Sequence, residues 1–212
     1  INSLDQVKHI AFGTINGADG KPFKTRDGGV LKLSDLISQF EASASLKMNK
    51  NLSSQEVAQA MPIIAMGAMK FSELKHNRLT DYNFDLEQFM SLEGFTGPYV
   101  LYSGVRAKSI LSKVEEIGNF SSEVSSDSER KLLLTINKFN QVFHSSLKHS
   151  EPHHLCEYAY ELANRFNNFY NDNHIIKETN IEKKKHLIAC TQLFLNTLSL
   201  TLSLLGIDIP EK

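Results

Sequence analysis

Three basic residues lie within six positions near the start of the chain, at Lys21, Lys24 and Arg26. Glycines flank this basic segment, with Gly20 before it and Gly28 after it. A glycine-rich backbone lets N–H groups approach a phosphate closely, and nearby cations neutralise the charge of the phosphate. The segment could therefore hold a phosphate group. It could also be the solvated tip of a hairpin, and the segment alone leaves both interpretations open.

A second group of residues combines aromatic and basic side chains. Tyr99, Tyr102 and Arg106 are spaced at i, i+3 and i+7, which places them on one face of a helix. Aromatic rings stack on bases and cations bind phosphates, so this face could bind nucleic acid. The same spacing is also typical of core residues edged by a charged rim.

The histidines and cysteines do not indicate a metal centre. His153, His154 and Cys156 are close in sequence, but neighbouring residues of a helix point apart, and no second ligand pair has metal-site spacing. Cys190 lies in an apolar helical segment, where a thiol is more typical of the core than of catalysis. We therefore predict no metal site.

The composition indicates a soluble globular protein, with 41% hydrophobic residues and a net charge of −1 over 212 residues. Binding to nucleic acid would depend on local basic patches. Two cysteines cannot form a disulfide framework and are typical of reduced thiols in a cytosolic protein. Residues 187–205 carry no charge, but polar residues lie along them, and we predict a buried helix rather than a membrane span.

The pattern of apolar residues predicts a mainly helical chain with a small β element at its start. Residues 7–16 are β-like and lead into the turn signal NGADG. Helical spacing begins after the basic segment. Ser53 and Glu56 predict a capping box at the start of one helix, and Pro62 is expected to kink or split that helix.

Three further helices are predicted after a Ser-rich linker. A stripe of apolar residues from Leu132 to Leu147 predicts the first, and Pro152 opens the second. Thr179 and Glu182 predict a capping box for the third helix. That helix is expected to end at a C-terminal cap formed by Gly206.

The order of these segments resembles bacterial arginyl-tRNA synthetase, a class I enzyme. The resemblance covers nearly the whole chain and rests on DGKPFKTRDGG, on GAMKFSELKHNRLTDYNFDLEQFMSLEGFTGPYVLYSGVRAKSIL and on the ending LSLLGIDIPEK. The HIGH-type motif of class I synthetases is absent, and we expect it in a nucleotide-binding fold before Ile1. His186 and Leu187 depart from the family pattern, which commonly has an Arg-Leu pair at that place.

The resemblance implies a mainly α fold, in which a helical-bundle anticodon-binding domain of the DALR type follows a helical junction and a short β/loop remnant of the class I catalytic domain. Residues 1–50 would form the end of the catalytic domain, with its KMSKS-type loop. Residues 51–117 would form the junction, 118–128 the linker and 129–212 the anticodon-binding domain.

The implied activity is the attachment of arginine to tRNA(Arg) with ATP, through an arginyl-adenylate. ATP with Mg²⁺ and arginine would be the substrates of the full-length enzyme, and tRNA(Arg) its partner. The enzyme would be a cytoplasmic monomer without membrane contact. The opposing interpretation is a non-catalytic helical module that binds RNA or protein.

The resemblance also assigns roles to residues. Lys24 is the first choice for stabilising the charge that builds on departing pyrophosphate, and Lys21 and Arg26 are the second. The implied nucleotide contacts are His9, Phe12, Gly13, Lys21, Lys24 and Thr25. The implied tRNA contacts are Asn77, Arg78, Tyr99, Tyr102, Arg106, Phe166, Asn167 and Tyr170. If Phe169 is buried with Phe166, Tyr170 is turned about 100° away and is free to stack on a base.

Overall fold

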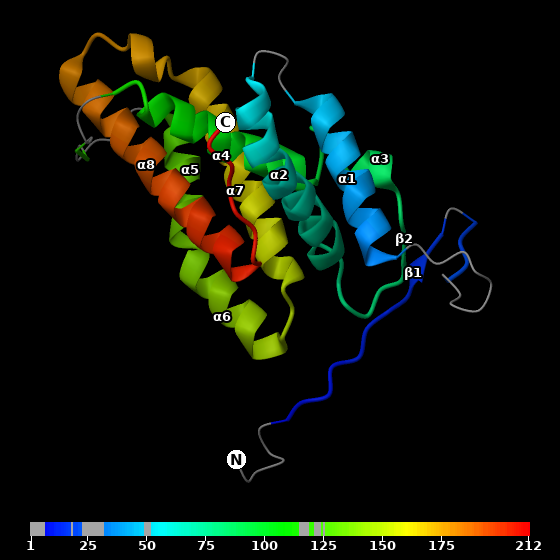
Figure 1. Ribbon diagram of the computed structural model, residues 1–212. Coiled ribbons are helices and arrows are strands. Elements are labelled where there is room, and N and C mark those ends of the chain that lie inside the picture. Colours follow the sequence, from blue (N-terminus) through cyan, green and yellow to red (C-terminus); the bar gives the residue numbers. More distant parts are fainter. Residues whose placement is uncertain are drawn as a thin grey trace.

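The computed structural model describes residues 7–17, 19–22, 32–48, 52–114, 119–120, 124 and 126–212. Within these residues the chain is mainly helical, as predicted, and its strands form one short parallel pair (Figure 1). Three residues of the predicted sites, Lys24, Thr25 and Arg26, lie outside the described residues.

The strand pair ties the start of the chain to the turn after the second helix. β1 (Ile15–Asn16) runs parallel to β2 (Tyr82–Asn83). The N–H of Gly13 donates to the Arg78 carbonyl at 2.6 Å. A β-carbon on Gly13 would lie 2.7 Å from the Thr80 backbone, so only glycine fits this close approach. The prediction of a β element is wrong for residues 7–14, which form no strand, although the Thr14 carbonyl accepts from the N–H of Tyr82 in β2.

α1 (Leu33–Lys47), α2 (Ser54–Leu74) and α3 (Leu86–Phe89) share a small core that includes Phe40, Ala68 and Phe89. α2 begins with the predicted capping box, in which Ser53 and Glu56 each accept a hydrogen bond from the backbone N–H of the other.

Pro62 does not split α2, which runs unbroken from Ser54 to Leu74, so the split that was one of the two predicted effects does not occur. The proline cannot donate to the carbonyl of Ala58, but both residues are exposed, so water can satisfy that carbonyl. The opposite side of α2 is packed through residues such as Ala65 and Phe71, which holds the helix together across the break in its hydrogen bonds.

α4 (Gly97–Leu111) crosses α2 at a point where both helices have glycine. A β-carbon on Gly97 would lie 2.9 Å from the Ala68 α-carbon and 3.1 Å from the Gly67 carbonyl oxygen. Because these neighbours belong to the backbone, they cannot move without separating the two helices. α4 begins at Thr96, whose side-chain oxygen accepts from the N–H of Tyr99.

We expect Gly97→Ala to destabilise the protein by about 1–3 kcal/mol, the usual cost of overpacking a core. Thermal unfolding of the purified chain measures this effect. Gly104→Ala is the matched control, because a β-carbon there meets the flexible side chain of Ile209 rather than backbone. If Gly97→Ala melts at or above the temperature of the Gly104→Ala variant, the helices can separate at little cost and the inferred close approach is not a constraint.

The second half of the chain forms a bundle of α5 (Asp127–Asn137), α6 (Phe139–His149), α7 (His153–Asp172) and α8 (Ile181–Leu204), with a short 3-10 helix at Ile175–Lys177 between the last two (Figure 1). The single helix predicted from Leu132 to Leu147 is therefore two helices. They separate at Lys138, whose N–H bonds to Thr135 three residues back instead of to residue 134.

α8 is long and apolar enough to cross a membrane by length and composition alone. In the fold, however, it packs against α4, α5 and α7, and half of its most apolar window is buried. This agrees with the prediction of a bundle helix.

The predicted caps of α8 have different outcomes. The predicted box of Thr179 and Glu182 is wrong, since Asn180 caps the helix by accepting from the N–H of Lys183 at 3.1 Å. Asparagine is among the best N-cap residues, which favours a helix start one position later than predicted. The C-terminal cap is confirmed, because Gly206 adopts φ 67°.

The C-terminal tail after α8 runs back along α4 (Figure 1). Lys108 of α4 donates to the Ile209 carbonyl at 2.9 Å and pairs with Glu211 at 2.6 Å. At the end of the tail, Lys212 pairs with Glu56 of α2 at 2.5 Å. The tail thus links the start of α2 and the middle of α4 to the end of the bundle.

Candidate nucleic-acid interface

A polar network joins α4 to α7. The Tyr99 hydroxyl donates to the Asn164 side chain at 2.6 Å. The Asn167 amide donates to the Tyr99 hydroxyl and to the Ser103 hydroxyl, both at 3.0 Å. The Asn167 side-chain carbonyl in turn accepts from the guanidinium of Arg106. Asn167 therefore fixes the orientation of groups on both helices.

Arg106 is held beside two tyrosine rings. Its guanidinium carbon lies 4.8 Å from the centre of the Tyr102 ring and 5.0 Å from the centre of the Tyr170 ring. Tyr102 comes from α4 and Tyr170 from the last turn of α7. Cation–π contacts of this kind stabilise the arrangement without consuming the hydrogen-bonding capacity of the guanidinium.

Both tyrosines remain accessible to solvent. Tyr102 is 52% exposed and Tyr170 is 37% exposed, whereas Arg106 and Asn167 are partly buried. The arrangement presents aromatic faces next to an oriented positive charge. Chemically, such a surface can stack on unpaired bases and bind a neighbouring phosphate. We call Tyr102, Arg106, Asn167 and Tyr170 the tyrosine–arginine cluster.

Of the predicted tRNA contacts, Phe166 is in the core. Its side chain is 0% exposed and its ring stacks on Phe194 of α8, with ring centres 3.9 Å apart and planes 2° from parallel. A base cannot reach a ring that is packed in this way, so the interpretation of Phe166 as a stacking residue is corrected. Phe169 is buried as well, which turns Tyr170 outward as the helical period predicted.

Asn77 and Arg78 lie elsewhere, in the turn that follows α2. Arg78 donates to the Ser150 carbonyl at 3.3 Å, which ties this turn to the connection between α6 and α7. The Asn77 side chain accepts from the N–H of Leu79 at 3.0 Å. Both residues line a groove of about 560 Å³ together with Phe12 and Gly13. The two predicted nucleotide contacts and the two predicted tRNA contacts thus share one surface, separate from the tyrosine–arginine cluster.

Lys21 lies at the entry to the basic segment. Its carbonyl accepts from the N–H of Gly17 at 2.9 Å, and its own N–H donates to the Asp19 carboxylate at 3.1 Å. Gly20 between them has φ 71°, a conformation that favours glycine. The turn holds the backbone of Lys21 and leaves its side chain exposed. His9 is exposed in the extended segment before β1.

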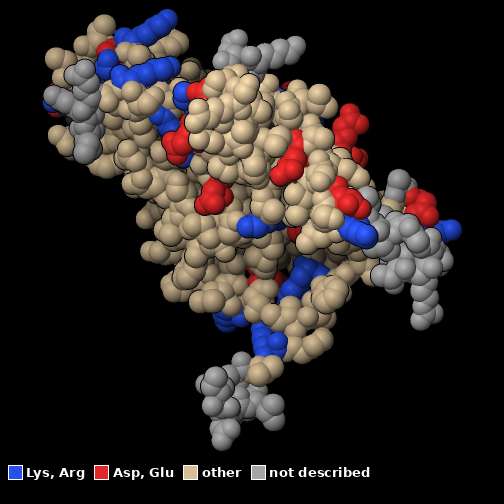
Figure 2. Space-filling model, in the orientation of Figure 1, with Lys and Arg blue, Asp and Glu red and all other residues tan. Residues whose placement is uncertain are grey.

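Basic side chains gather at the end of the molecule where α8 begins, as Figure 2 shows, whereas acidic and basic side chains are interspersed over the rest of that face. The sequence has Lys183, Lys184 and Lys185 at this end, and two of them are balanced by Glu178 and Glu182. The tyrosine–arginine cluster includes the last turn of α7, a short distance along the chain from this basic end.

Two family models match the chain. Residues 100–212 match the model described as "DALR anticodon binding domain". The chain belongs to the DALR anticodon-binding domain family. Residues 2–86 match a second model, described as "tRNA synthetases class I (R), catalytic domain". All residues of the tyrosine–arginine cluster fall within the DALR match, and the groove with Phe12 and Gly13 is built largely from the catalytic-domain match.

Proteins similar to the chain are named arginine–tRNA ligase or arginyl-tRNA synthetase. The chain is 43% identical over 212 residues to an arginine–tRNA ligase of Alkaliphilus oremlandii, covering 97% of this chain and 36% of the relative. The arginyl-tRNA synthetase of Thermus thermophilus has a similar structure, with a TM-score of 0.85 and 26% identity over 96% of this chain and 35% of that one. For the Plasmodium falciparum enzyme the TM-score is 0.77 and the identity 27%, with the same coverage. The predicted resemblance is thus confirmed, and the chain spans about 36% of the length of its relative.

Some members of the network were not predicted. Ser103 and Asn164 hold Asn167 and Tyr99 in place, but neither residue type is conspicuous in the sequence. The only signal in the sequence for these two residues was their position relative to predicted residues. Ser103 lies one helical turn after Tyr99, and Asn164 lies one turn before Asn167, so both share a face with a predicted residue.

Proposed function

We propose that the chain is part of an arginine–tRNA ligase, which attaches arginine to tRNA(Arg) with ATP through an arginyl-adenylate. In this proposal ATP, with its Mg²⁺, and arginine are substrates of the whole enzyme, which acts as a monomer in the cytoplasm. Residues 1–50 supply the end of the catalytic domain, 51–117 the junction, 118–128 the linker and 129–212 the anticodon-binding domain.

The observation that carries the tRNA-binding part of the proposal is the tyrosine–arginine cluster. Arg106 is oriented by Asn167 and by two rings before any ligand arrives. Preorganisation matters because a free arginine loses side-chain entropy on binding, whereas a held one has already lost it. The exposed rings of Tyr102 and Tyr170 can then stack on bases that are splayed out of an RNA loop.

Local positive charge also bears on RNA binding. With a net charge of −1, the chain has no overall attraction for RNA, so binding depends on local cations. Arg106 and the lysines at the start of α8 supply them. Each phosphate contact releases counterions, and we therefore expect tRNA binding to weaken steeply as salt rises. The proposed nucleotide contacts are a separate set at the front of the chain: His9, Phe12, Gly13, Lys21, Lys24 and Thr25.

Tyr170→Ala is expected to weaken tRNA(Arg) binding by about 1–3 kcal/mol, the usual contribution of one base stack. Tyr170 is at the edge of the core, so thermal stability should change little. Titration of labelled tRNA(Arg) with the purified chain measures the affinity, and circular dichroism measures the melting temperature. Tyr170→Phe keeps the ring and loses the hydroxyl, and this control should bind nearly as well as the original chain.

A lower melting temperature with unchanged tRNA affinity in Tyr170→Ala would show that Tyr170 is a packing residue. Failure of the original chain to prefer tRNA(Arg) over an unrelated RNA of similar length would favour the opposing interpretation, a helical module without this specificity. The two results are distinguishable, because the first concerns one residue and the second concerns the whole surface.

A further inference from the structure

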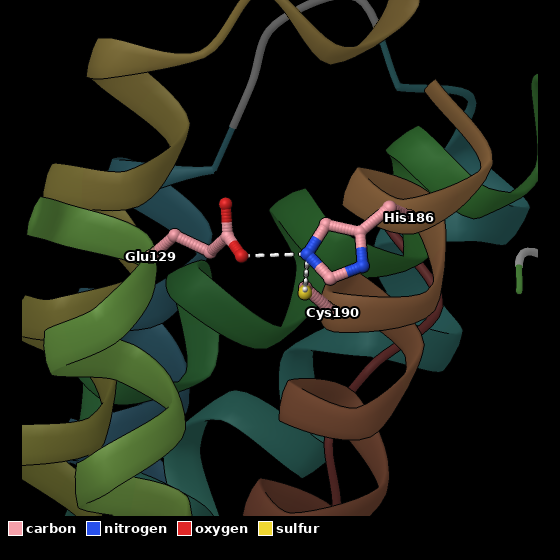
Figure 3. Close-up of side chains that lie close together, drawn as sticks. All are labelled: Glu129, His186 and Cys190. Carbon is pink, nitrogen blue, oxygen red and sulfur yellow. Dashed lines mark hydrogen bonds and ion pairs between the residues drawn. The ribbon is translucent and has the colours of Figure 1, made fainter. Parts of the chain in front are cut away.

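Three side chains of metal-ligating types converge inside the bundle, and none of them belongs to the tyrosine–arginine cluster. Figure 3 shows Glu129 of α5 facing His186 and Cys190 of α8. Glu129 Oε1 lies 2.6 Å from His186 Nε2, and Cys190 Sγ lies 3.6 Å from the same nitrogen. All three residues are buried. Glu129 and His186 also make further contacts within the chain.

The arrangement differs from that of an activated nucleophile. In a cysteine–histidine–carboxylate triad the carboxylate binds one ring nitrogen and the thiol the other, so that the ring can take a proton and be oriented at once. Here both partners meet Nε2. Burial, with a smaller contribution from Glu129, also raises the pKa of Cys190 to about 12, so the group is a thiol at neutral pH. Nucleophilic catalysis by Cys190 is therefore not supported.

We propose that Glu129, His186 and Cys190 form a binding site for a zinc-type divalent cation. The donor atoms lie within 4.8 Å of one another. Imidazole nitrogen, thiolate sulfur and carboxylate oxygen are the ligands that Zn²⁺ takes, at about 2.0–2.3 Å in tetrahedral geometry. These bond lengths put a nitrogen and a sulfur ligand about 3.6 Å apart. The separation of His186 Nε2 and Cys190 Sγ is the same, 3.6 Å.

The third ligand needs a small adjustment. Nitrogen and oxygen ligands of tetrahedral zinc are about 3.3 Å apart, whereas Glu129 Oε1 and His186 Nε2 are 2.6 Å apart because they share a proton. The cation would replace the proton between these two atoms. If the His186 ring is neutral, its proton moves from Nε2 to Nδ1; if the ring is an imidazolium, the Nε2 proton is released to solvent. A rotation of the Glu129 carboxylate then opens the required space. The fourth position remains for water or for the second oxygen of Glu129.

The charge of the site matches a divalent cation. A buried ion requires nearby compensation of its charge. The Glu129 carboxylate supplies one negative charge, and Cys190 supplies another when its thiol proton is released to solvent, as coordinating thiols do. With neutral His186 the loaded site has no net charge. The cation would bridge α5 to α8 and so tie together the two sides of the bundle.

Sequence spacing could not show this site. Cys190 follows His186 by one helical turn, but Glu129 is 57 positions from His186 and reaches it only through the packing of α5 on α8. Zinc-site patterns depend on ligand pairs close in sequence on both sides. The prediction of no metal site rested on the spacing around His153, His154 and Cys156, and it assigned Cys190 to the core.

That other group serves as a control. Glu151, His153 and His154 also bring ligand atoms within 4.8 Å. They stand at the start of α7, where the positive end of the helix dipole opposes a cation. Metal binding at the two groups can be distinguished by the presence of a thiolate ligand, because the group at the start of α7 has no thiol among its ligands.

The test is a titration of the purified 212-residue chain with Co²⁺, which takes zinc sites and gives a near-ultraviolet charge-transfer band when a thiolate is bound. The original chain should bind one Co²⁺ with this band, and excess Zn²⁺ should remove it. Cys190→Ala should lose the band and weaken metal binding by about 100-fold or more, since even indirect support of a ligand accounts for 10- to 100-fold. Cys156→Ala, which removes the other buried thiol, should leave the band unchanged.

Other results would overturn the proposal. It fails if the original chain shows no thiolate band, if Cys190→Ala keeps the band, or if the His154→Ala variant loses it instead. Glu129→Gln preserves shape and tests the carboxylate separately, with an expected loss in affinity of about 10-fold or more. If Cys190→Ala does not fold, the melting temperature provides the test. Zn²⁺ should raise the melting temperature of the original chain and of Cys156→Ala, because a ligand that binds the native state stabilises it. No rise in either protein contradicts the site.

Discussion

Phe166→Ala is expected to lower the free energy of unfolding by about 3–5 kcal/mol, the usual cost of removing a fully buried aromatic side chain. Phe166 has no exposed surface, and it lies against Phe194 in a parallel stack 3.9 Å between ring centres. The truncation would leave a cavity between α7 and α8, the two longest helices of the bundle, and the loss comes from both burial and packing. Urea-induced unfolding followed by circular dichroism measures the change.

The same helix supplies the control. Tyr170→Ala removes a comparable aromatic side chain one turn away from Phe166, but from a partly exposed position, so it should cost much less stability. The two variants should therefore separate stability from tRNA binding. A stable Phe166→Ala protein with weakened tRNA affinity would restore the original assignment of Phe166 as a base-stacking residue and would show that the stack with Phe194 is dispensable.

The contrast between Phe166 and Tyr170 shows which kind of sequence information was reliable. The helical period alone requires that Tyr170 face away when Phe169 is buried, and the structure agrees. Matching the family pattern also selected Phe166, which lies on the buried side. A pattern identifies the segment that forms a surface, whereas the period identifies the side of the helix that faces solvent.

Local chemistry was also predictable where it depends on neighbours in sequence. The capping box at Ser53 and Glu56 and the left-handed Gly206 follow from side-chain reach and backbone sterics, and both are present. The break between α5 and α6 was missed because the apolar stripe continues through Lys138 although the hydrogen bonding does not. The cap of α8 was misplaced because two good capping residues, Thr179 and Asn180, are adjacent.

Contacts between distant segments were beyond sequence reasoning. Arg106 meets Asn167 across 61 positions, and His186 meets Glu129 across 57. Both contacts depend on how two helices cross, which is determined by packing along their whole length. The sequence suggested binding for Arg106 and no site for His186, and only the fold shows that Arg106 is oriented and that His186 is enclosed with an acid and a thiol.

Lys24→Ala is expected to slow arginyl-adenylate formation by roughly 10- to 1000-fold in the proposed ligase, with little change in arginine affinity. The expectation rests on the proposed function. When the arginine carboxylate attacks the α-phosphate of ATP, negative charge builds on the departing pyrophosphate. A cation placed beside that charge acts mainly in the transition state, and one such contact is worth on the order of 3 kcal/mol. The rate of ATP–pyrophosphate exchange measures the effect, and the Michaelis constant for arginine reports binding.

The fold supports the choice of this segment. The turn at Gly20 and the bridge between Asn16 and Pro22 fix where the basic segment begins, and β1 attaches that point to β2 beside the groove of Phe12 and Gly13. Lys32→Ala is the matched control. It removes an equal charge at the exposed N-cap of α1, and it should leave the exchange rate unchanged. Equal exchange rates in Lys24→Ala and the original enzyme would make Lys24 a solvated hairpin residue, which was the other interpretation of the segment. A loss shared by both variants would instead indicate a general effect of charge on nucleotide binding, since Lys32 has no proposed contact with ATP.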